Sequence, residues 1–438
     1  MPFKSRPSSR SRKQRSYSIE PLETRTTPTA NLLTHHGDLL NTGTNQEEIA
    51  LRYDNVNINQ FGKLREYAVD GQVYAQPLYV ANLVFPAGPN VGTRNVVYVA
   101  TQGNSVYAID ADTAQVLWQR SFIDPANGIT TIPQPDVITE DIAPEIGITS
   151  TPAIDLNLQS IYLIARTKEI RGSDVHYVQT LHALDLTSGA NKFGGPEVIA
   201  DTIYNGTTYT YVSGPTIDGF GDGHVNGQVT YNALRQNQRP ALRIVGDELY
   251  VMAASHGDNG PYHGWLLSYD LDTLDLERVF NTTPNGSQGG IWMGGAGISV
   301  DEQGYFYFAA SNGTFGDETI DATGFPTNGN YANTVLKLAL DDSTSPQNPN
   351  TNGWGFRVVD YFTPFDQEYL SFVDLNLGSG GVLILPESVG SPAHPRLLIT
   401  GGKHGVTYLI DRDYMGKYNP TTDNVVQKIT SINGVMCT

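Results

Sequence analysis

The stretch from Val97 to Trp118 reads VYVATQGNSVYAIDADTAQVLW. It contains the apolar runs VYVA, SVYAID and QVLW, and between them lie turn-forming residues such as Gly103 and Asp112. Short runs of β-branched and aromatic residues bounded by Gly, Asn and Asp are typical of β-strands joined by tight turns. The stretch therefore predicts three consecutive short strands.

The same pattern returns four more times along the chain. The copies begin at Ile161, Leu249, Tyr305 and Leu397. Asp110 ends the third strand of the first unit, and the positions aligned with it recur every 70 to 85 residues, at Asp185, Asp270, Leu340 and Asp411. An apolar segment precedes each copy and supplies a fourth, innermost strand. Recurring four-stranded units predict an all-β fold, a β-propeller whose antiparallel sheets, called blades, surround an axis.

The repeat also resembles a known family. Its AxDxxTGxxxW pattern is similar to the repeat of the pyrroloquinoline quinone (PQQ) propellers, and it is carried by Ala108, Asp110, Thr113 and Trp118. The runs DGQVYAQPLYV, SHGDNGPYHGW, NTTPNGSQGGIWM, DLNLGSGGVLILP and LLITGGKHGVTYLIDRD look like a bacterial exported subgroup of PQQ-binding-like propellers, over about residues 35 to 415. The resemblance implies a propeller of seven or eight four-stranded blades.

The number of units is smaller than the resemblance implies. The sequence supplies five units and a further strand over residues 62–69, which we expect to complete the last blade as a clasp of the ring. We therefore expect a propeller that is incomplete at its C-terminus and a chain that is a fragment of a longer protein. The alternative is a smaller closed ring. Open blade edges would favour association with another chain.

Several repeated residues have an expected structural role. The aspartates that end the third strands suit turns, because their short side chains bond neighbouring backbone amides. Trp118, Phe193 and Phe280 close their units, and we expect these rings to pack between blades.

The first residues differ in composition from the rest. Residues 1–16 carry six basic residues and no acidic one, which predicts a disordered basic tail over residues 1–34 ahead of a propeller domain over residues 35–438. The tract PLETR at residues 21–25 resembles a short N-terminal motif of exported bacterial proteins. It favours an extracytoplasmic location, either secreted, periplasmic or at the cell surface. No apolar core of a secretion signal accompanies it, so the export route stays open.

The composition excludes two classes of partner. The chain has 27 basic and 45 acidic residues, and six of the basic ones lie in residues 1–16. A propeller this acidic repels nucleic acid. No segment approaches the apolar length of a membrane helix. We therefore expect neither a nucleic-acid partner nor a membrane span.

A binding site is predicted on one face of the propeller. Strand direction alternates within a blade, so the second-to-third and fourth-to-first connections leave the same face. These connections hold most of the unusual polar and aromatic residues, and rigid strands would position them at the mouth of the central channel. The candidate ligand-binding residues are His256, Asp258, Asn259, His263, Trp292, Asn312, Lys403 and His404.

The same residues have alternative structural roles. The two histidines of the SHGDNGPYHGW run could satisfy the backbone of the loop that they flank. Lys403 and His404 could be solvated residues of a tight turn, and Trp292 could pack on the next blade instead of stacking on a sugar or a flat cofactor. Candidate catalytic residues are His263, Lys403 and Glu145.

Cofactor and metal signals are sparse. The Gly-rich insertion DGFGDGHVNG spaces oxygen ligands for a calcium site at Asp218, Asp222 and Asn226. The resemblance implies PQQ, but the methanol-oxidising members carry two adjacent cysteines beneath that cofactor. This chain has one cysteine, Cys437, so it cannot bind PQQ in that manner.

Two function classes follow. The first is an exported propeller that binds a surface polysaccharide or a protein through its loop-rich face. The second is an enzyme, either a quinoprotein oxidoreductase with His263 as base and Lys403 and Glu145 near the quinone and its calcium, or a propeller hydrolase with paired carboxylates. No convincing pair of acids is found for hydrolysis. The binding function is the one that we expect.

Overall fold

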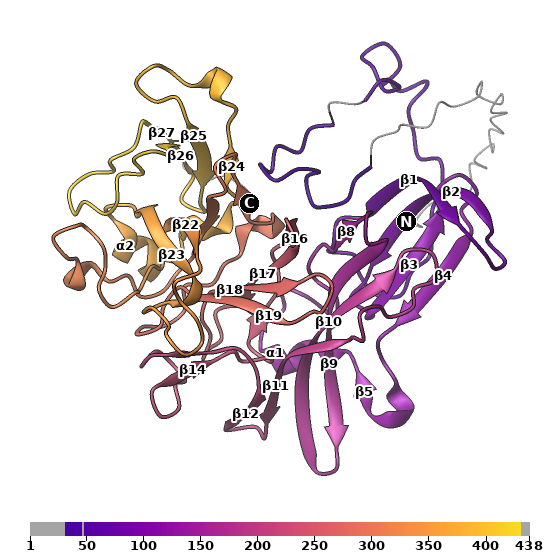
Figure 1. Cartoon of the computed structure of the whole chain (residues 1–438), viewed down its shortest axis with the longest axis horizontal. Helices are drawn as coiled ribbons and strands as arrows, with labels where there is room; N and C mark the ends of the chain where they lie inside the picture. Colours follow the sequence, from indigo (N-terminus) through magenta and orange to yellow (C-terminus); the bar gives the residue numbers. More distant parts are fainter. Residues whose placement is uncertain (1–30, 46–47, 431–438) are drawn as a thin grey trace, which may run out of the picture.

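The computed structural model describes residues 31–45 and 48–430, and its main elements are five four-stranded antiparallel units (Figure 1). The first and the fifth are separate sheets, the second is part of a six-stranded sheet, and the third and fourth are joined in a nine-stranded sheet. Within each unit the strands are ordered as in the sequence, so the predicted units are confirmed as blades 1 to 5. Blade 1 consists of β1 (Leu78–Phe85), β2 (Gly92–Ala100), β3 (Ser105–Asp110) and β4 (Val116–Ser121), and blade 2 of β8 (Ala153–Asp155), β9 (Ser160–Arg171), β10 (Asp174–Asp185) and β11 (Glu197–Tyr204). Blade 3 consists of β16 (Arg243–Val245), β17 (Glu248–Ser255), β18 (Trp265–Asp270) and β19 (Leu276–Asn281), and blade 4 of β20 (Ser299–Val300), β21 (Phe306–Ala309), β22 (Val335–Asp341) and β23 (Gly353–Phe362). Blade 5 consists of β24 (Leu383–Ile384), β25 (Leu397–Gly401), β26 (Val406–Asp411) and β27 (Gln427–Thr430).

Shorter elements are attached to the blades. The strands β5 (Ile129–Thr130) and β12 (Tyr209–Ser213) pair with the edges of blade 2 and widen it. The long β9–β10 hairpin of blade 2 projects away from the other sheets at the bottom of Figure 1. None of the helices in the described residues is long and apolar enough to cross a membrane. The remaining strands and helices are β6 (Ile132–Pro133), β7 (Glu145–Ile146), β13 (Thr216–Asp218), β14 (Gln228–Thr230), β15 (Gln236–Asn237), α1 (Gln134–Val137) and α2 (Gln367–Phe372), with 3-10 turns at Pro125–Asn127, Met293–Gly295, Asp317–Thr319, Leu377–Ser379 and Glu387–Val389.

The repeated aspartates hold turns, as the sequence predicts. The Asp110 carboxylate accepts hydrogen bonds from the amides of Asp112 and Thr113, and Asp185 and Asp270 do the same in blades 2 and 3. The fourth unit needs a correction of one residue. Its turn is held by Asp341, at the end of β22, and not by Leu340, since the Asp341 carboxylate accepts the Ser343 amide. β22 ends at Asp341, so the turn begins one residue later than the alignment placed it.

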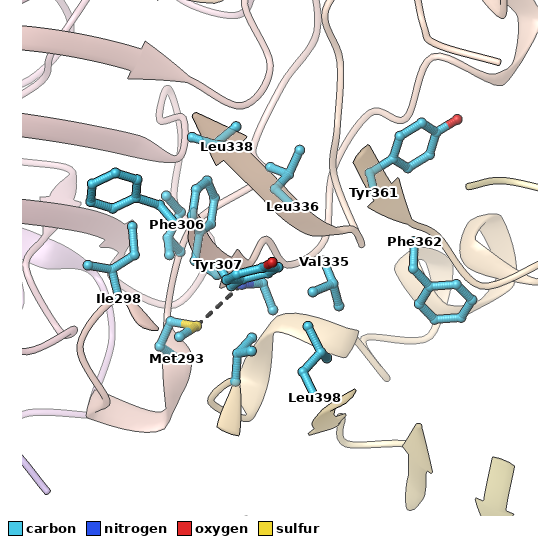
Figure 2. Close-up of a cluster of buried hydrophobic side chains, with 14 of the residues drawn as sticks. Met293, Ile298, Phe306, Tyr307, Val335, Leu336, Leu338, Tyr361, Phe362 and Leu398 are labelled. Carbon is cyan, nitrogen blue, oxygen red and sulfur yellow. Dashed lines mark hydrogen bonds between the residues drawn. The ribbon is translucent and has the colours of Figure 1, made fainter. Parts of the chain in front are cut away.

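The hydrophobic core lies between neighbouring blades. Buried side chains of blades 1 and 2 form one cluster, those of blades 2 and 3 another, and those of blades 3 to 5 a third. Trp118 packs across the first of these interfaces, where a Cβ on Gly189 would lie only 2.7 Å from its ring. Figure 2 shows the third cluster, with Met293 beside Phe306 and Tyr307. Stacking of sheets therefore buries both faces of the inner blades.

Polar contacts fix the stacking. The Tyr98 hydroxyl of blade 1 donates to the carbonyl of Leu186 in blade 2 at 2.8 Å, and the Tyr162 hydroxyl of blade 2 donates to the carbonyl of Leu271 in blade 3 at 3.0 Å. Both acceptors directly follow the turn aspartate of the next blade. Blades 3 and 4 are joined further, because β19 pairs with β23 at Gly353, whose lack of a Cβ permits this approach.

The chain before blade 1 connects all five blades. Residues 31–42, which we call the axial segment, lie along the innermost strands. Leu32 pairs with Tyr79 of blade 1, the Leu33 carbonyl accepts the Ile154 amide of blade 2, and Arg243 of blade 3 donates to Thr34 and to the carbonyls of His35 and Asp38. The carbonyls of Leu39 and Leu40 accept the amides of Val300 in blade 4 and Ile384 in blade 5.

The expected clasp is therefore wrong. Residues 62–69 form no strand, and in the described residues no strand of blade 5 pairs with blade 1. These two blades face each other across the indigo and violet chain that precedes β1 (Figure 1). Residues 31–34, which the sequence assigns to the tail, belong to the axial segment.

Candidate functional site

A pocket of about 500 Å³ opens on the face that the sequence singles out. Every residue that lines it comes from a second-to-third connection or from the chain between two blades, as expected for one face of the propeller. The lining consists of Thr139, Asp141, Arg239, Gly257, Asp258, Trp292, Gly294, Asp374, Asn376, Ser379 and Lys403. Three predicted residues, Asp258, Trp292 and Lys403, thus meet in one pocket although they lie in three different connections.

Trp292 forms an aromatic wall of this pocket. Its side chain is partly exposed, and it directly precedes the 3-10 turn Met293–Gly295. A Cβ on Gly290 would come within 3.2 Å of the indole nitrogen, so glycine at that position leaves room for the ring. Met293 points the other way, into the core cluster (Figure 2). The connection therefore turns an aromatic residue to the pocket and a thioether to the core.

Lys403 and Asp374 form an ion pair at the pocket rim. The Lys403 ammonium lies 3.0 and 3.1 Å from the two carboxylate oxygens of Asp374. Asn312 and Asn376 donate their amides to the same carboxylate, at 2.6 and 3.0 Å. Asn312 thus supports Asp374 and does not itself line the pocket. Asp374 was missed among the candidates, although it begins the quoted DLNLGSGGVLILP run.

The loop after β17 supplies Asp258. Its backbone has φ 56°, and its carboxylate accepts the hydroxyl of Tyr262. Burial and the neighbouring Asp258 hold the pKa of Tyr262 well above its usual range, so the phenol stays a donor. Asn259 anchors the loop to the C-terminal end of α1, since its side-chain amide donates to the carbonyls of Val137, the last residue of α1, and Ile138, the residue after it. Asn259 therefore positions Asp258 and is not part of the lining.

The predicted histidines are engaged elsewhere. His256 is fully buried with Nε2 against the guanidinium of Arg166, and burial and then Arg166 keep its pKa well below the usual range. Both ring nitrogens of His263 are engaged, Nδ1 with the Thr283 hydroxyl at 2.9 Å and Nε2 with the Asp222 carbonyl at 2.8 Å. The structural role that the sequence left open was to satisfy the backbone of the loop between the two histidines, and these imidazoles instead contact Arg166, Thr283 and Asp222, which lie outside that loop.

The two remaining candidates also lie apart from the lining. His404 turns toward blade 5, where Nε2 contacts the Tyr408 hydroxyl at 3.0 Å and burial lowers the pKa of the imidazole. Glu145 lies in β7 and accepts the Thr131 hydroxyl at 2.7 Å. The catalytic candidates His263, Lys403 and Glu145 are therefore not brought together in one pocket.

Arg239 is a lining residue that sequence reasoning missed. Its guanidinium makes no hydrogen bond or ion pair with any residue in 31–45 or 48–430, and burial lowers its pKa. It precedes the innermost strand of blade 3 and appears in the sequence only as the start of an apolar segment. Nothing local marks it, because its importance arises from the pocket into which the other connections bring it.

The calcium candidates lie outside the pocket. Asp218 ends β13 and accepts the amide of Gln228 from β14, Asn226 occupies a turn with φ 54°, and Asp222 uses its carbonyl to bind His263. Within the described part of the chain no group of three or more His, Cys, Asp or Glu side chains is arranged to hold a metal ion. Calcium at Asp218, Asp222 and Asn226 stays a prediction, and melting in calcium against chelator tests it.

The whole chain resembles a solved quinoprotein enzyme. A quinohemoprotein alcohol dehydrogenase from Comamonas testosteroni superposes with a TM-score of 0.50 at 13% sequence identity, covering 93% of this chain and 50% of that enzyme. The chain has a β-propeller fold. It spans about half the length of the enzyme, and at this identity the likeness concerns the fold alone.

Other comparisons give weaker likenesses. A europium-containing methanol dehydrogenase superposes with a TM-score of 0.48 at 13% identity, over 92% of this chain and 58% of that one. BamB from Moraxella catarrhalis gives 0.33 at 12% identity, over 77% and 58% of the two chains. No protein-family model matches the sequence, and no curated protein matches it either. The chemistry of the site must therefore be argued from its own residues.

The pocket does not fit PQQ. This cofactor is a flat quinone with three carboxylates, so its site needs several cations. The lining offers only Arg239 and Lys403, and Lys403 is already paired with Asp374. Asp141 and Asp258 would add two further carboxylates beside the ligand. The calcium candidates cannot offset these charges in the lining, because they lie on a different hairpin.

Proposed function

We propose that this protein is an exported β-propeller that binds a surface carbohydrate in the pocket lined by Trp292, Asp374 and Lys403. The observation that carries the proposal is the composition of the lining, which joins one partly exposed indole with charged and amide groups from separate connections. An aromatic face stacks on the apolar face of a sugar ring, while the polar groups bind its hydroxyls. A concave pocket of about 500 Å³ suits a saccharide unit better than the flat surface of a protein partner.

The location is part of the proposal. The PLETR tract and the resemblance to exported propellers support an extracytoplasmic site, where surface polysaccharides are found. The net charge of −18 disfavours nucleic acid as the ligand.

The enzyme alternative has less support. An oxidoreductase with His263 as base needs that imidazole free, and both of its ring nitrogens are engaged by Thr283 and Asp222. Its proposed helpers Lys403 and Glu145 have separate partners. Binding is therefore the function that we propose.

Calorimetric titration with a panel of oligosaccharides tests the function. We expect at least one to bind, and Trp292→Ala to weaken its binding at least about fivefold at an unchanged melting temperature, since stacking on an aromatic ring contributes about 1 kcal/mol or more. Tyr53→Ala is the matched control, because Tyr53 is fully exposed outside the pocket. Equal binding by the wild type and Trp292→Ala would contradict the proposal.

A further inference from the structure

The pocket contains a cation that has no partner. Arg239 is partly buried, so its guanidinium has lost part of its hydration, yet none of its N–H groups has a hydrogen-bond acceptor or an ion-pair partner within the described residues. A guanidinium offers five N–H donors in a planar fork that matches a carboxylate. A partly buried and unpaired cation costs free energy that an anionic ligand would recover.

The surroundings hold this guanidinium in place. A Cβ on Gly295 would lie 2.4 Å from its Nη1, so only glycine leaves space for the arginine there. Beneath it lies the axial segment, where burial lowers the pKa of His35 to about 3 and keeps that imidazole neutral. Arg243 is nearby, but it is a second cation and donates to the carbonyls of His35 and Asp38, so neither it nor the neutral His35 offers Arg239 a negative charge. Charge compensation for Arg239 must therefore come from the pocket side.

The rest of the lining favours a ligand that carries hydroxyl donors. Asp141, Asp258 and Asp374 present carboxylates, which accept hydrogen bonds and repel further anions. A neutral sugar would offer Arg239 only uncharged hydroxyl acceptors and would leave its charge without compensation, whereas a phosphate or a tricarboxylate would place several negative charges beside these aspartates. A ligand with one carboxylate, several hydroxyls and a ring for Trp292 satisfies all of these groups.

We infer that the pocket selects acidic sugars, namely the uronic acid residues of an anionic polysaccharide, with the uronate carboxylate on Arg239 and the sugar ring on Trp292. This inference rests on the proposed carbohydrate-binding function, and it deepens that function by naming the class of sugar. Arg239 is then the residue that sets specificity.

The test uses the full chain and calorimetry with oligomers of glucuronic, galacturonic and mannuronic acid, each beside its fully methyl-esterified form. The ester keeps the ring and the hydroxyls and removes only the charge. We expect the wild type to bind at least one acid about tenfold to a hundredfold more tightly than its ester, as charge-assisted hydrogen bonds do. Arg239→Gln should abolish this difference and Arg239→Lys should keep part of it.

Arg120→Gln is the matched control, because Arg120 is an exposed arginine of β4 outside the pocket. Melting temperatures of all variants show whether they fold. If Arg239→Gln does not fold, the partial selectivity expected of Arg239→Lys still tests the inference. Equal affinity for acids and esters, or selectivity that survives in Arg239→Gln, overturns the inference and leaves the carbohydrate function standing. If no acid and no ester binds, the inference is overturned, and the wider oligosaccharide panel decides the carbohydrate function separately.

Discussion

Arg243 donates a hydrogen bond from Nη2 to the side-chain oxygen of Asn41 at 2.5 Å, across 202 residues of sequence. The Asn41 amide in turn donates to the Gly297 carbonyl and the Ser299 hydroxyl of the chain entering blade 4, both at 2.8 Å, and to the Val382 carbonyl before blade 5 at 3.3 Å. One asparagine of the axial segment thus connects three blades. Because blades 1 and 5 do not pair within residues 31–45 and 48–430, this segment links the two ends of the row of sheets there.

Asn41→Ala should lower the free energy of unfolding by about 2 to 4 kcal/mol. The substitution leaves a buried guanidinium donor and the buried Gly297 carbonyl without their partner, whereas the Val382 carbonyl keeps the Ser299 hydroxyl as donor. Each unsatisfied group costs about 1 to 3 kcal/mol, with partial relaxation. Urea unfolding followed by circular dichroism measures the loss. Asn59→Ala is the control, because Asn59 is exposed, and it should change stability by less than about 0.5 kcal/mol. Equal stability of the two variants would show that the axial segment does not hold the blades.

The hydroxyls of the two tyrosines between blades should contribute differently to the free energy of unfolding. The Leu271 carbonyl accepts the hydroxyl of Tyr162, whereas the Leu186 carbonyl accepts both Tyr98 and the indole of Trp118. Tyr162→Phe should therefore cost about 1 to 3 kcal/mol, and Tyr98→Phe only about 0.5 to 1 kcal/mol, because Leu186 keeps one donor. Denaturant unfolding of both variants checks the order, and a larger loss for Tyr98→Phe would contradict it.

Acid should destabilise the protein through its buried histidines. Burial lowers the pKa of His35 and His182 to about 3, from an unfolded value of 6.5. The unfolded chain then binds more protons below pH 6.5, so stability is complete above that pH and falls as the pH drops toward 3. Each of these histidines contributes a slope of up to about 1.4 kcal/mol per pH unit.

His182→Asn tests this linkage. The free energy of unfolding, measured from pH 7 to pH 4.5, should fall less steeply with decreasing pH in the variant than in the wild type. The difference in slope should correspond to the uptake of up to about one proton on unfolding. His394→Asn is the control, because the His394 side chain is 44% exposed. A slope that stays the same in His182→Asn would show that His182 is protonated in the folded state.

The sequence was sufficient to predict the features that neighbouring residues determine, namely the turns and the strands. Asp110, Asp185 and Asp270 hold turns with their own neighbouring amides, so their role is legible in a few residues of sequence, and the recurring strands reveal the blades. The one misaligned unit is the fourth, where Leu340 was aligned in place of Asp341, the residue at which β22 ends. The axial segment was missed, since it carries no strand pattern and its bonds reach residues 79 to 384.

The candidate site was predicted in part. Its face and three of its lining residues follow from strand alternation. The burial of His256 and His263 could not be predicted, because an imidazole in a polar loop looks the same in sequence whether it faces the pocket or the interior. Arg239 and Asp374 were missed for the related reason that the partners of a charged residue come from distant connections.

The central claim is that a sugar ring stacks on Trp292 in the pocket, and the indole N–H signals of the protein test it most directly. The chain has four tryptophans, and Trp265 is fully buried between blades, so it serves as an internal reference. Spectra are recorded while the tightest-binding uronic acid oligomer is added, with Trp292→Phe to assign the signal. We predict that the Trp292 signal shifts progressively and saturates while the Trp265 signal stays in place. Saturated binding with an unmoved Trp292 signal would contradict the account.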